Sequence, residues 1–586
     1  MKYIKKFYYY LLPFWKRDKV GYIMDKSEYP IFLIFLSAIF LGIYLIPLAE
    51  FSNDDGNSMI GSMYVLNAIY DSVKDGVIKP SLYAGYVNSY GLSMSRFPSY
   101  LHALALFIFN RSVRSVHYFA VLFNAVAIFL TYVLSKELYN KNVGLLSCLL
   151  YMTAPAFAVF YSLKVWFLIY LPPFIVLTMF SLYKIRNDNQ KYLLLLAFAL
   201  GMAIQFHATA FLLIPITIIY LNNYLWDKFR AKKLNLRYTF SSLILFLLLS
   251  IPYLLTISQK MIFYIFIGFI VVVPCLFLLY YLTSIKFQSQ PGYSLIRILI
   301  FILLVFSILI SYVNFKPLII TPLDLVPGNN EYIESHIGMT KGYGSIVDYP
   351  QVDVALLILF ILLVLFKIFT KKPDNNDSLV FAWMVVPLLS FYYVAFMTDL
   401  NCGNTCPHQW FIVIFPAPFI AISAILNKIY RTYFMTETRY FIPTFALFLL
   451  VQNVIFDVSA YKFIDKTGGI GPHRPNLEVE EEVVRYILSK DGVPTIILVG
   501  NLEKWRAVPS YVFLVGNLRS VNTNSNLTFY VMEKDSSRYN NGKKFEKILE
   551  ELPIIEERRI KSVVVKVSPE YDPRVGNTIW RAPIDT

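Results

Sequence analysis

The chain has 586 residues, of which 57% are apolar, 17% are aromatic and only 16% are charged. This charge content is well below the roughly 25% of a soluble globular domain, so the composition excludes a protein whose main solvent is water. The net charge of +15 does not indicate nucleic-acid binding. Lys and Arg lie mostly in short stretches between apolar runs, where they act as topology signals.

Thirteen apolar runs predict membrane-spanning helices. A helix rises 1.5 Å per residue, needs about 20 residues to cross the hydrocarbon core and satisfies its own backbone polar groups there. In chain order the runs are 30–49, 116–134, 143–161, 166–183, 192–206, 210–221, 239–257, 261–282, 295–313, 352–369, 379–397, 409–426 and 441–456. A further run, 100–109, is too short to be assigned by length.

The distribution of positive charge decides the role of the short run. Seven Lys and Arg residues between Lys2 and Lys26 place the segment 1–29 in the cytosol and the loop 50–115 outside. If 100–109 does not span, the basic loops between later runs also fall inside. We therefore predict that 100–109 is a helix lying on the outer face. Thirteen spans from a cytosolic start then place all residues after 456 outside.

The chain changes character near residue 462. A Gly/Pro linker at 462–475 precedes an amphipathic helical pattern at 477–489, and β-branched or aromatic runs at 495–499, 528–532 and 562–567 predict strands, with a second helix at 544–552. The predicted fold is an α-helical polytopic membrane domain at 30–461 followed by a small extracytoplasmic α/β domain at 462–586. A lid or scaffold over the membrane domain and direct substrate contact are both open as roles for this second domain.

Two of the four cysteines lie in a predicted outer loop. Cys148 and Cys275 fall within predicted spans and are interpreted as small buried apolar residues. Cys402 and Cys406 fall outside the membrane, where a disulfide persists, so we predict a bridge that pins this loop. Two free thiols are the alternative.

Two adjacent carboxylates follow the first span by about five residues. Asp54 and Asp55 repel each other, so at least one needs a partner, which is a metal ion, a basic side chain or an acceptor hydroxyl. A carboxylate so placed can act as a general base that takes a proton from a nucleophilic hydroxyl. The structural alternative is that the two carboxylates are hydrated and only end the first spanning helix.

Further polar side chains occur at the same predicted level of the membrane. Each alone is commonly a satisfied interfacial residue. Together they would give one cavity both carboxylates and cations, a combination that suits group transfer from a lipid-linked phosphate. These residues are Arg96, Lys164 and His207 as candidate donor-phosphate ligands, and His408 and Gln409 as candidate substrate contacts.

Several motifs resemble one family. Asn-Asp-Asp-Gly at 53–56, Ser-Arg-Phe-Pro at 95–98 and Phe-His-Ala-Thr at 206–209 are similar to the membrane core of the GT-C glycosyltransferases, closest to the lipid A aminoarabinose transferases and protein O-mannosyltransferases. The resemblance covers about 30–225 and, more weakly, 378–427. It implies thirteen spans, surface helices in the first outer loop and an outer C-terminal domain.

The resemblance also implies roles for individual residues. The family's acidic motif falls on Asp54 and Asp55, which implies a catalytic base or a metal-binding pair, and its basic residue before the loop proline falls on Arg96, which implies contact with the donor phosphate. The chain departs from the family pattern at Lys164, where the basic residue is shifted, and at His207, where a basic side chain is common. These departures leave the donor sugar and the full set of phosphate ligands open.

The expected function is that of a multi-pass cell-membrane glycosyltransferase. It would move a sugar from a polyprenyl-phosphate donor to a protein, lipid or glycan acceptor on the outer face. The requirement for a divalent metal ion as cofactor is left open. A transporter or flippase of lipid-linked sugars is the alternative from another class, but the internal repeats typical of transporters are not seen. An oligosaccharyltransferase would carry a Trp-Trp-Asp-Tyr-Gly run, which the sequence lacks. A purely structural membrane scaffold is the third alternative.

Overall fold

A computed structural model describes most of the helical part of the chain. The described residues are 15–18, 21–24, 28–49, 53–75, 86–87, 93–94, 97–155, 158, 167–254, 375–397, 412–433, 440–467, 476–490, 495–499, 527–533, 549–561, 563–568 and 579–581.

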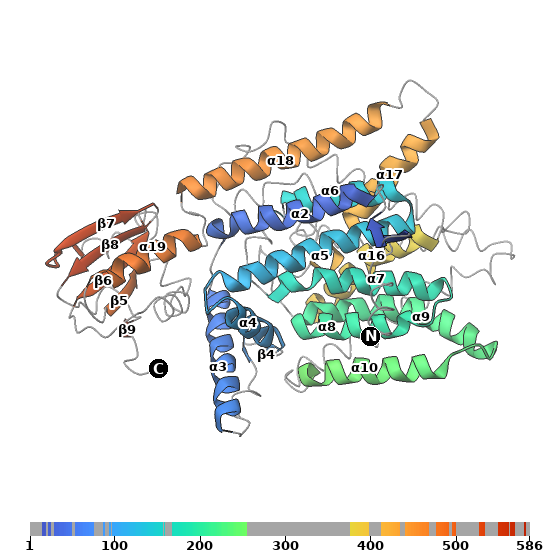
Figure 1. Ribbon diagram of the computed structural model, residues 1–586, viewed down its shortest axis with the longest axis horizontal. Coiled ribbons are helices and arrows are strands. Elements are labelled where there is room, and N and C mark those ends of the chain that lie inside the picture. The colour runs from blue at the N-terminus through green and yellow to red at the C-terminus, as the bar shows by residue number, and fades with distance from the viewer. Residues whose placement is uncertain are drawn as a thin grey trace.

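Long helices that run side by side form a bundle (Figure 1). Long apolar runs give these helices, although α16 contains the interior proline Pro387, and their shared apolar faces form one large core cluster. The helices are α2 (Tyr29–Leu45), α5 (Ser115–Leu138), α6 (Lys141–Thr153), α7 (Pro172–Arg186), α8 (Tyr192–Phe206), α9 (Leu213–Arg230), α10 (Leu236–Leu254), α16 (Asn375–Met397), α17 (Ala417–Tyr433) and α18 (Phe441–Thr467), with the 3-10 turns η2 (Ile46–Leu48), η5 (Phe167–Tyr170) and η6 (Ala208–Leu212).

Five of the described helical segments are long and apolar enough to cross a membrane. They are Tyr29–Leu48, Ser115–Leu138, Phe167–Arg186, Ile412–Thr432 and Phe441–Thr467. Helices occupy ten of the thirteen predicted spans, whereas 261–282, 295–313 and 352–369 lie outside the described residues. The chain is thus a membrane protein with apolar spanning helices, and the total of thirteen stays a prediction.

Basic residues gather at one end of the bundle. Lys136 ends α5 and contacts Glu28 at 2.5 Å, Lys184 ends α7 and contacts Glu137 at 2.7 Å, and Lys228 ends α9. Tyr132 also donates a hydrogen bond to Glu28, so α2 and α5 are joined at this end. These are the loops that the positive-charge rule assigns to the cytosol, which stays a prediction.

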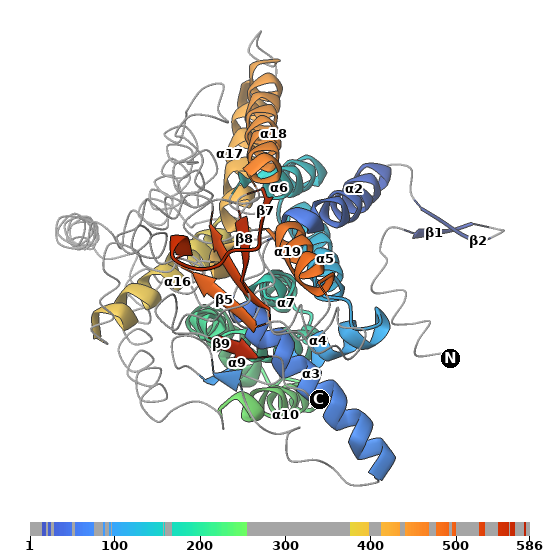
Figure 2. The ribbon, with the colours of Figure 1, turned by 90° about the vertical axis from the view of Figure 1, so that its left-hand side faces the viewer.

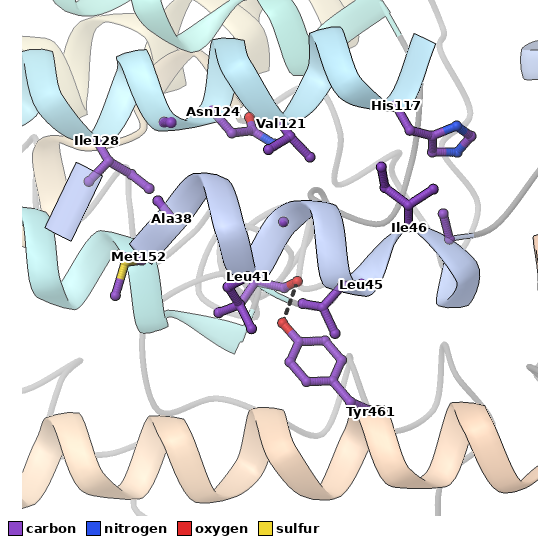
Figure 3. A pocket seen from close by; sticks show the side chains of 14 residues that line it. Ala38, Leu41, Leu45, Ile46, His117, Val121, Asn124, Ile128, Met152 and Tyr461 are labelled. Atoms are coloured by element: carbon purple, nitrogen blue, oxygen red, sulfur yellow. Dashed lines mark hydrogen bonds between the residues drawn. The ribbon is translucent and has the colours of Figure 1, made fainter. Parts of the chain in front are cut away.

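Two helices lie across the opposite end of the bundle. α3 (Asn53–Asp75) and α4 (Phe97–Ile108) run at a steep angle to α5, as Figures 1 and 2 show from two directions. α4 contains most of the run 100–109, for which a surface helix is predicted. α3 lies in the first outer loop, where the family resemblance implies surface helices, but the residues themselves did not predict a helix at 53–75.

The C-terminal part contains a helix and a five-stranded sheet at the same end of the bundle as α3 (Figure 1). α19 (Leu477–Leu488), β5 (Thr495–Val499), β6 (Thr528–Glu533) and β8 (Val563–Ser568) occupy predicted positions. The strand order is β7-β8-β6-β5-β9, with β5 and β6 parallel and the other pairs antiparallel. The edge strands β7 (Glu556–Ile560) and β9 (Ile579–Arg581) were not predicted, nor were the hairpins β1–β2 (Trp15–Asp18, Gly21–Met24) and β3–β4 (Tyr86–Val87, Ser93–Met94).

The predicted boundary between the two domains is less sharp in the structure. α18 continues to Thr467 and so passes through part of the predicted linker 462–475. The predicted helix 544–552 lies mostly outside the described residues. The division into domains stays a prediction.

α19 packs directly onto the end of the bundle. The backbone N–H of Leu477 donates to the carbonyl of Ala49 at 2.8 Å. Val483 and Ile487 of α19 share one buried apolar cluster with Ala105 of α4 and Val116 of α5. The C-terminal part therefore has a common core with the end of the bundle that carries α3 and α4.

A charged pair fixes the same contact. Arg114, which precedes α5, donates two hydrogen bonds to Glu481 of α19, at 3.2 Å from Nε and 2.8 Å from Nη2. Glu481 has only 6% of its side chain exposed. The hydrogen bonds and the charge of Glu481 raise the pKa of Arg114 above its ordinary value.

We expect Arg114→Ala to loosen α19 from the bundle. A hydrogen bond to a charged group contributes about 1.5–3 kcal/mol. Removing the Arg114 guanidinium also leaves the buried Glu481 carboxylate with one cationic partner fewer. Arg485 is a matched control because its Nη2 also lies 2.8 Å from Glu481, but within α19 itself. Hydrogen exchange of residues 477–488 measures the effect. Equal protection of α19 in Arg114→Ala and Arg485→Ala would contradict the role given to Arg114.

A glycine allows α5 and α6 to approach closely. A Cβ at Gly144 would lie 3.0 Å from both the Tyr132 ring and the Tyr132 carbonyl oxygen, which belongs to the backbone and cannot move freely. At Gly61 of α3 no atom lies within 4 Å of such a Cβ. We expect Gly144→Ala to destabilise the protein by about 1–3 kcal/mol, and Gly61→Ala to be neutral or to stabilise it by about 0.5–1 kcal/mol. Thermal unfolding in detergent compares them, and the same sign for both variants would be the contrary result.

Candidate active site

The acidic motif lies at the beginning of a helix. Asp54 and Asp55 are the second and third residues of α3, so they start a new helix and do not merely end the first span. The positive end of the helix dipole favours negative charge at this position, and an ionised carboxylate is the form that a general base needs. Both side chains lie outside the described part of the structure.

Aromatic rings from three segments meet near the same end of the bundle. The ring of Phe206, at the end of α8, lies 5.5 Å from that of Phe97, the first residue of α4, and 5.6 Å from that of Tyr170 in η5. Phe206 is 1% exposed and Tyr170 is fully buried. This packing fixes the beginning of α4, the segment η5 and the end of α8 relative to one another.

A buried histidine adds α3 to this group. His102 of α4 has its Nδ1 2.9 Å from Ser58 Oγ on α3 and its Nε2 2.9 Å from Tyr170 Oη. The His102 ring also lies 5.4 Å from the ring of Phe167. We call Ser58, Phe97, His102, Phe167, Tyr170 and Phe206 the aromatic–histidine cluster.

Each candidate residue of the first half of the chain is a near neighbour in sequence of one cluster member. Asp55 precedes Ser58 by three residues, Arg96 precedes Phe97, Lys164 precedes Phe167 by three, and His207 follows Phe206. Arg96 and Lys164 themselves lie outside the described residues. The structure therefore brings together the segments that carry these candidates, while the positions of the charged groups stay predictions.

His207 has a structural role in the described geometry. It is buried, and its Nδ1 accepts a hydrogen bond from the backbone N–H of Thr209 at 3.2 Å, which caps η6. A nitrogen that accepts here carries no proton. The sequence predicts a phosphate-binding role for His207. Only Nε2 is left for such a contact, and the role stays a prediction.

The later candidates fall on a part of the chain that is not described. His408, Gln409, Cys402 and Cys406 all lie in 398–411, between α16 and the turn that begins at Ile412. The flanking segments are joined because Trp383 Nε1 of α16 donates to the carbonyl of Val413 at 2.9 Å. The substrate contacts and the disulfide stay predictions.

No cluster of three or more His, Cys, Asp or Glu side chains that could hold a metal ion occurs among the described residues. The side chains of Asp54 and Asp55 are not among them, so a divalent ion at this pair also stays a prediction.

Ser58, His102 and Tyr170 were not predicted from the sequence. The sequence does contain a signal for His102, because it is a polar residue inside the otherwise apolar run 100–109. In the structure its side chain is buried. Ser58 lies one turn after Asp54 on α3, so it could be found only once 53–75 was known to be helical.

Comparison with known proteins identifies a family for part of the chain. Residues 95–256, just over a quarter of the sequence, match the family described as dolichyl-phosphate-mannose-protein mannosyltransferase. This match confirms the resemblance to the GT-C glycosyltransferases over a segment that includes Arg96, Lys164 and His207. No curated protein matches the chain significantly.

The chain is also similar to several solved structures at low identity. ArnT from Cupriavidus metallidurans, solved with undecaprenyl phosphate, is 10% identical with a TM-score of 0.43, covering 93% of this chain and 98% of its own. The archaeal oligosaccharyltransferase AglB from Archaeoglobus fulgidus, solved with an inhibitory peptide and a dolichol-phosphate, is 10% identical with a TM-score of 0.47, covering 86% of this chain and 70% of its own.

Proposed function

We propose that the protein is an integral membrane glycosyltransferase that moves a sugar from a polyprenyl-phosphate donor to a hydroxyl acceptor on the outer face of the membrane. The observation that carries this proposal is the family match at 95–256, which spans the three candidate phosphate ligands. The aromatic–histidine cluster supports it, because it joins the segments bearing these ligands to α3, which carries Asp54 and Asp55 in its first turn.

The proposed reaction is a single displacement with inversion at the anomeric carbon. Asp55, or Asp54, takes the proton of the acceptor hydroxyl as its oxygen attacks C1 of the sugar. The bond from C1 to the phosphate oxygen breaks, and the electron pair leaves with the polyprenyl phosphate. Arg96, with Lys164 or His207, stabilises the charge that develops on this phosphate.

Cleavage of a defined donor tests the proposal. Purified protein in liposomes is given polyprenyl-phosphate mannose, labelled in the sugar, and a membrane extract as the source of acceptor. We expect label to leave the donor and free polyprenyl phosphate to accumulate in equal amount. Movement of intact donor between the leaflets, without release of polyprenyl phosphate, would replace this proposal with a flippase. If mannose is not transferred, donors with other hexoses and with aminopentoses define the sugar.

A further inference from the structure

The side chain of His102 connects three elements through both of its ring nitrogens. It is fully buried in α4, and its partners are Ser58 of α3 and Tyr170 of η5, which are 44 and 68 positions away in the sequence. A buried imidazole needs partners for both ring nitrogens, and here these partners belong to two other elements. Because both nitrogens are used, the ring sets the distance between α3 and η5 and not only the packing of α4.

The contacts also have a definite direction. Tyr170 Oη donates to the carbonyl of Val116 at 3.4 Å, and a carbonyl can only accept. The Tyr170 oxygen therefore accepts from Nε2–H of His102, which leaves Nδ1 to accept from the Ser58 hydroxyl. The chain of donors runs from Ser58 through His102 and Tyr170 to Val116, and it needs one neutral tautomer.

The surroundings keep His102 in that neutral form. Burial, and to a smaller extent the nearby His117, lower the pKa of His102 to about 3. Its ring also packs 5.4 Å from the rings of both Phe167 and Tyr170. At neutral pH one nitrogen thus donates and the other accepts.

We propose that His102 is a positioning residue for transfer: it holds the first turns of α3, which carry Asp54 and Asp55, at a fixed separation from η5, which follows Lys164. This role rests on the proposed glycosyltransferase function. Ser58 lies one turn after the acidic pair, so a shift of Ser58 is passed along the helix to the carboxylates. A displacement of about 1 Å between base and donor is enough to lower a rate by about 100-fold.

Substitutions remove the connection in single steps. His102→Phe keeps the ring and loses both hydrogen bonds. Ser58→Ala loses only the bond between Ser58 and His102, whereas Tyr170→Phe loses the bond to His102 together with the one to Val116. His102→Gln restores a side chain that can both donate and accept. Tyr132→Phe is the matched control, because Tyr132 is also buried and also loses one hydrogen bond, to Glu28 at the opposite end of the bundle.

The first measurement is hydrogen exchange of the full-length protein in nanodiscs, which does not depend on activity. We expect amides around residues 58–62 of α3 to exchange about 10-fold faster in His102→Phe and Tyr170→Phe, as loss of one hydrogen bond implies. Tyr132→Phe should leave α3 unchanged. Unchanged exchange of α3 in His102→Phe would overturn the proposal.

The second measurement is donor cleavage per folded protein, as kcat and KM. We expect His102→Phe to lower kcat by about 10–100-fold, with the donor KM changed less than about 3-fold, and His102→Gln to recover part of the loss. A kcat equal to wild type in His102→Phe, or an equal loss in Tyr132→Phe, would show that His102 only stabilises the fold. If wild-type protein cleaves no donor while α3 still loosens, the proposed function fails and the connection of α3 to η5 stands.

Discussion

Replacing Asp55 or Asp54 with Asn should lower the rate of sugar transfer by about 10²–10⁴-fold, the contribution of a general base. Asn has nearly the same shape as Asp but cannot take the proton of an acceptor hydroxyl. Successive residues of a helix point about 100° apart, so only one of the two carboxylates can face the acceptor directly. We therefore expect one variant to lose most of its activity and the other to lose less.

The assay is the initial rate of label transfer from the polyprenyl-phosphate donor, normalised to monodisperse protein. Asp71→Asn is the matched control, since Asp71 is an exposed carboxylate on the same helix, more than four turns further on. It should retain the wild-type rate. Wild-type rates in both Asp54→Asn and Asp55→Asn would rule out the proposed mechanism, and equal losses in all three variants would indicate a general effect on α3.

Chelation distinguishes a base from a metal-binding pair. If Asp54 and Asp55 bind a divalent ion, EDTA should abolish transfer and added Mg²⁺ or Mn²⁺ should restore it, because two carboxylates alone hold such an ion only moderately. A general base would keep its activity in EDTA. Activity that survives EDTA would therefore exclude a metal-binding role for the pair, whereas loss of activity would show that transfer needs an ion.

The fold was predictable where a single local pattern decides the structure. α8 and β5 have the same bounds as the predicted segments 192–206 and 495–499, because a long apolar run or a β-branched run has one strong preference. α3 mixes polar and apolar residues around two glycines, and β7 reads Glu-Glu-Arg-Arg-Ile. Their structure depends on neighbours, namely α4 for α3 and β8 for β7, which a local pattern does not contain.

The sequence predicts charged groups for the candidate site but not the connections between the segments that carry them. Asp54, Asp55 and Arg96 could be proposed as site residues, because charged groups next to the membrane are energetically costly and often serve a function. Ser58, His102 and Tyr170 carry no charge in their working form, and each is an ordinary residue in its own segment. Only the packing of α3, α4 and η5 brings these three side chains within hydrogen-bonding distance.

Phe206→Ala should be the most destabilising single change within the aromatic–histidine cluster. Its ring contacts those of Phe97, Tyr170 and Phe174, the last at 5.3 Å in a stacked arrangement. Removing a buried Phe side chain costs about 3–5 kcal/mol in soluble proteins because of the cavity that it leaves. Lipid is itself apolar, so burial from water contributes less here, and we expect a value near the lower end.

The effect on activity should exceed the effect on the amount of folded protein. Phe97 follows Arg96 and Phe206 precedes His207, so collapse around the cavity moves both predicted phosphate ligands away from the acidic pair. Phe198→Ala is the matched control, because Phe198 lies on the same helix but is 39% exposed. Thermal unfolding and donor cleavage per folded protein are measured for both. If the two variants unfold at the same temperature and cleave donor at the same rate, the cluster does not hold these segments together, and their convergence would have to be explained by the rest of the bundle.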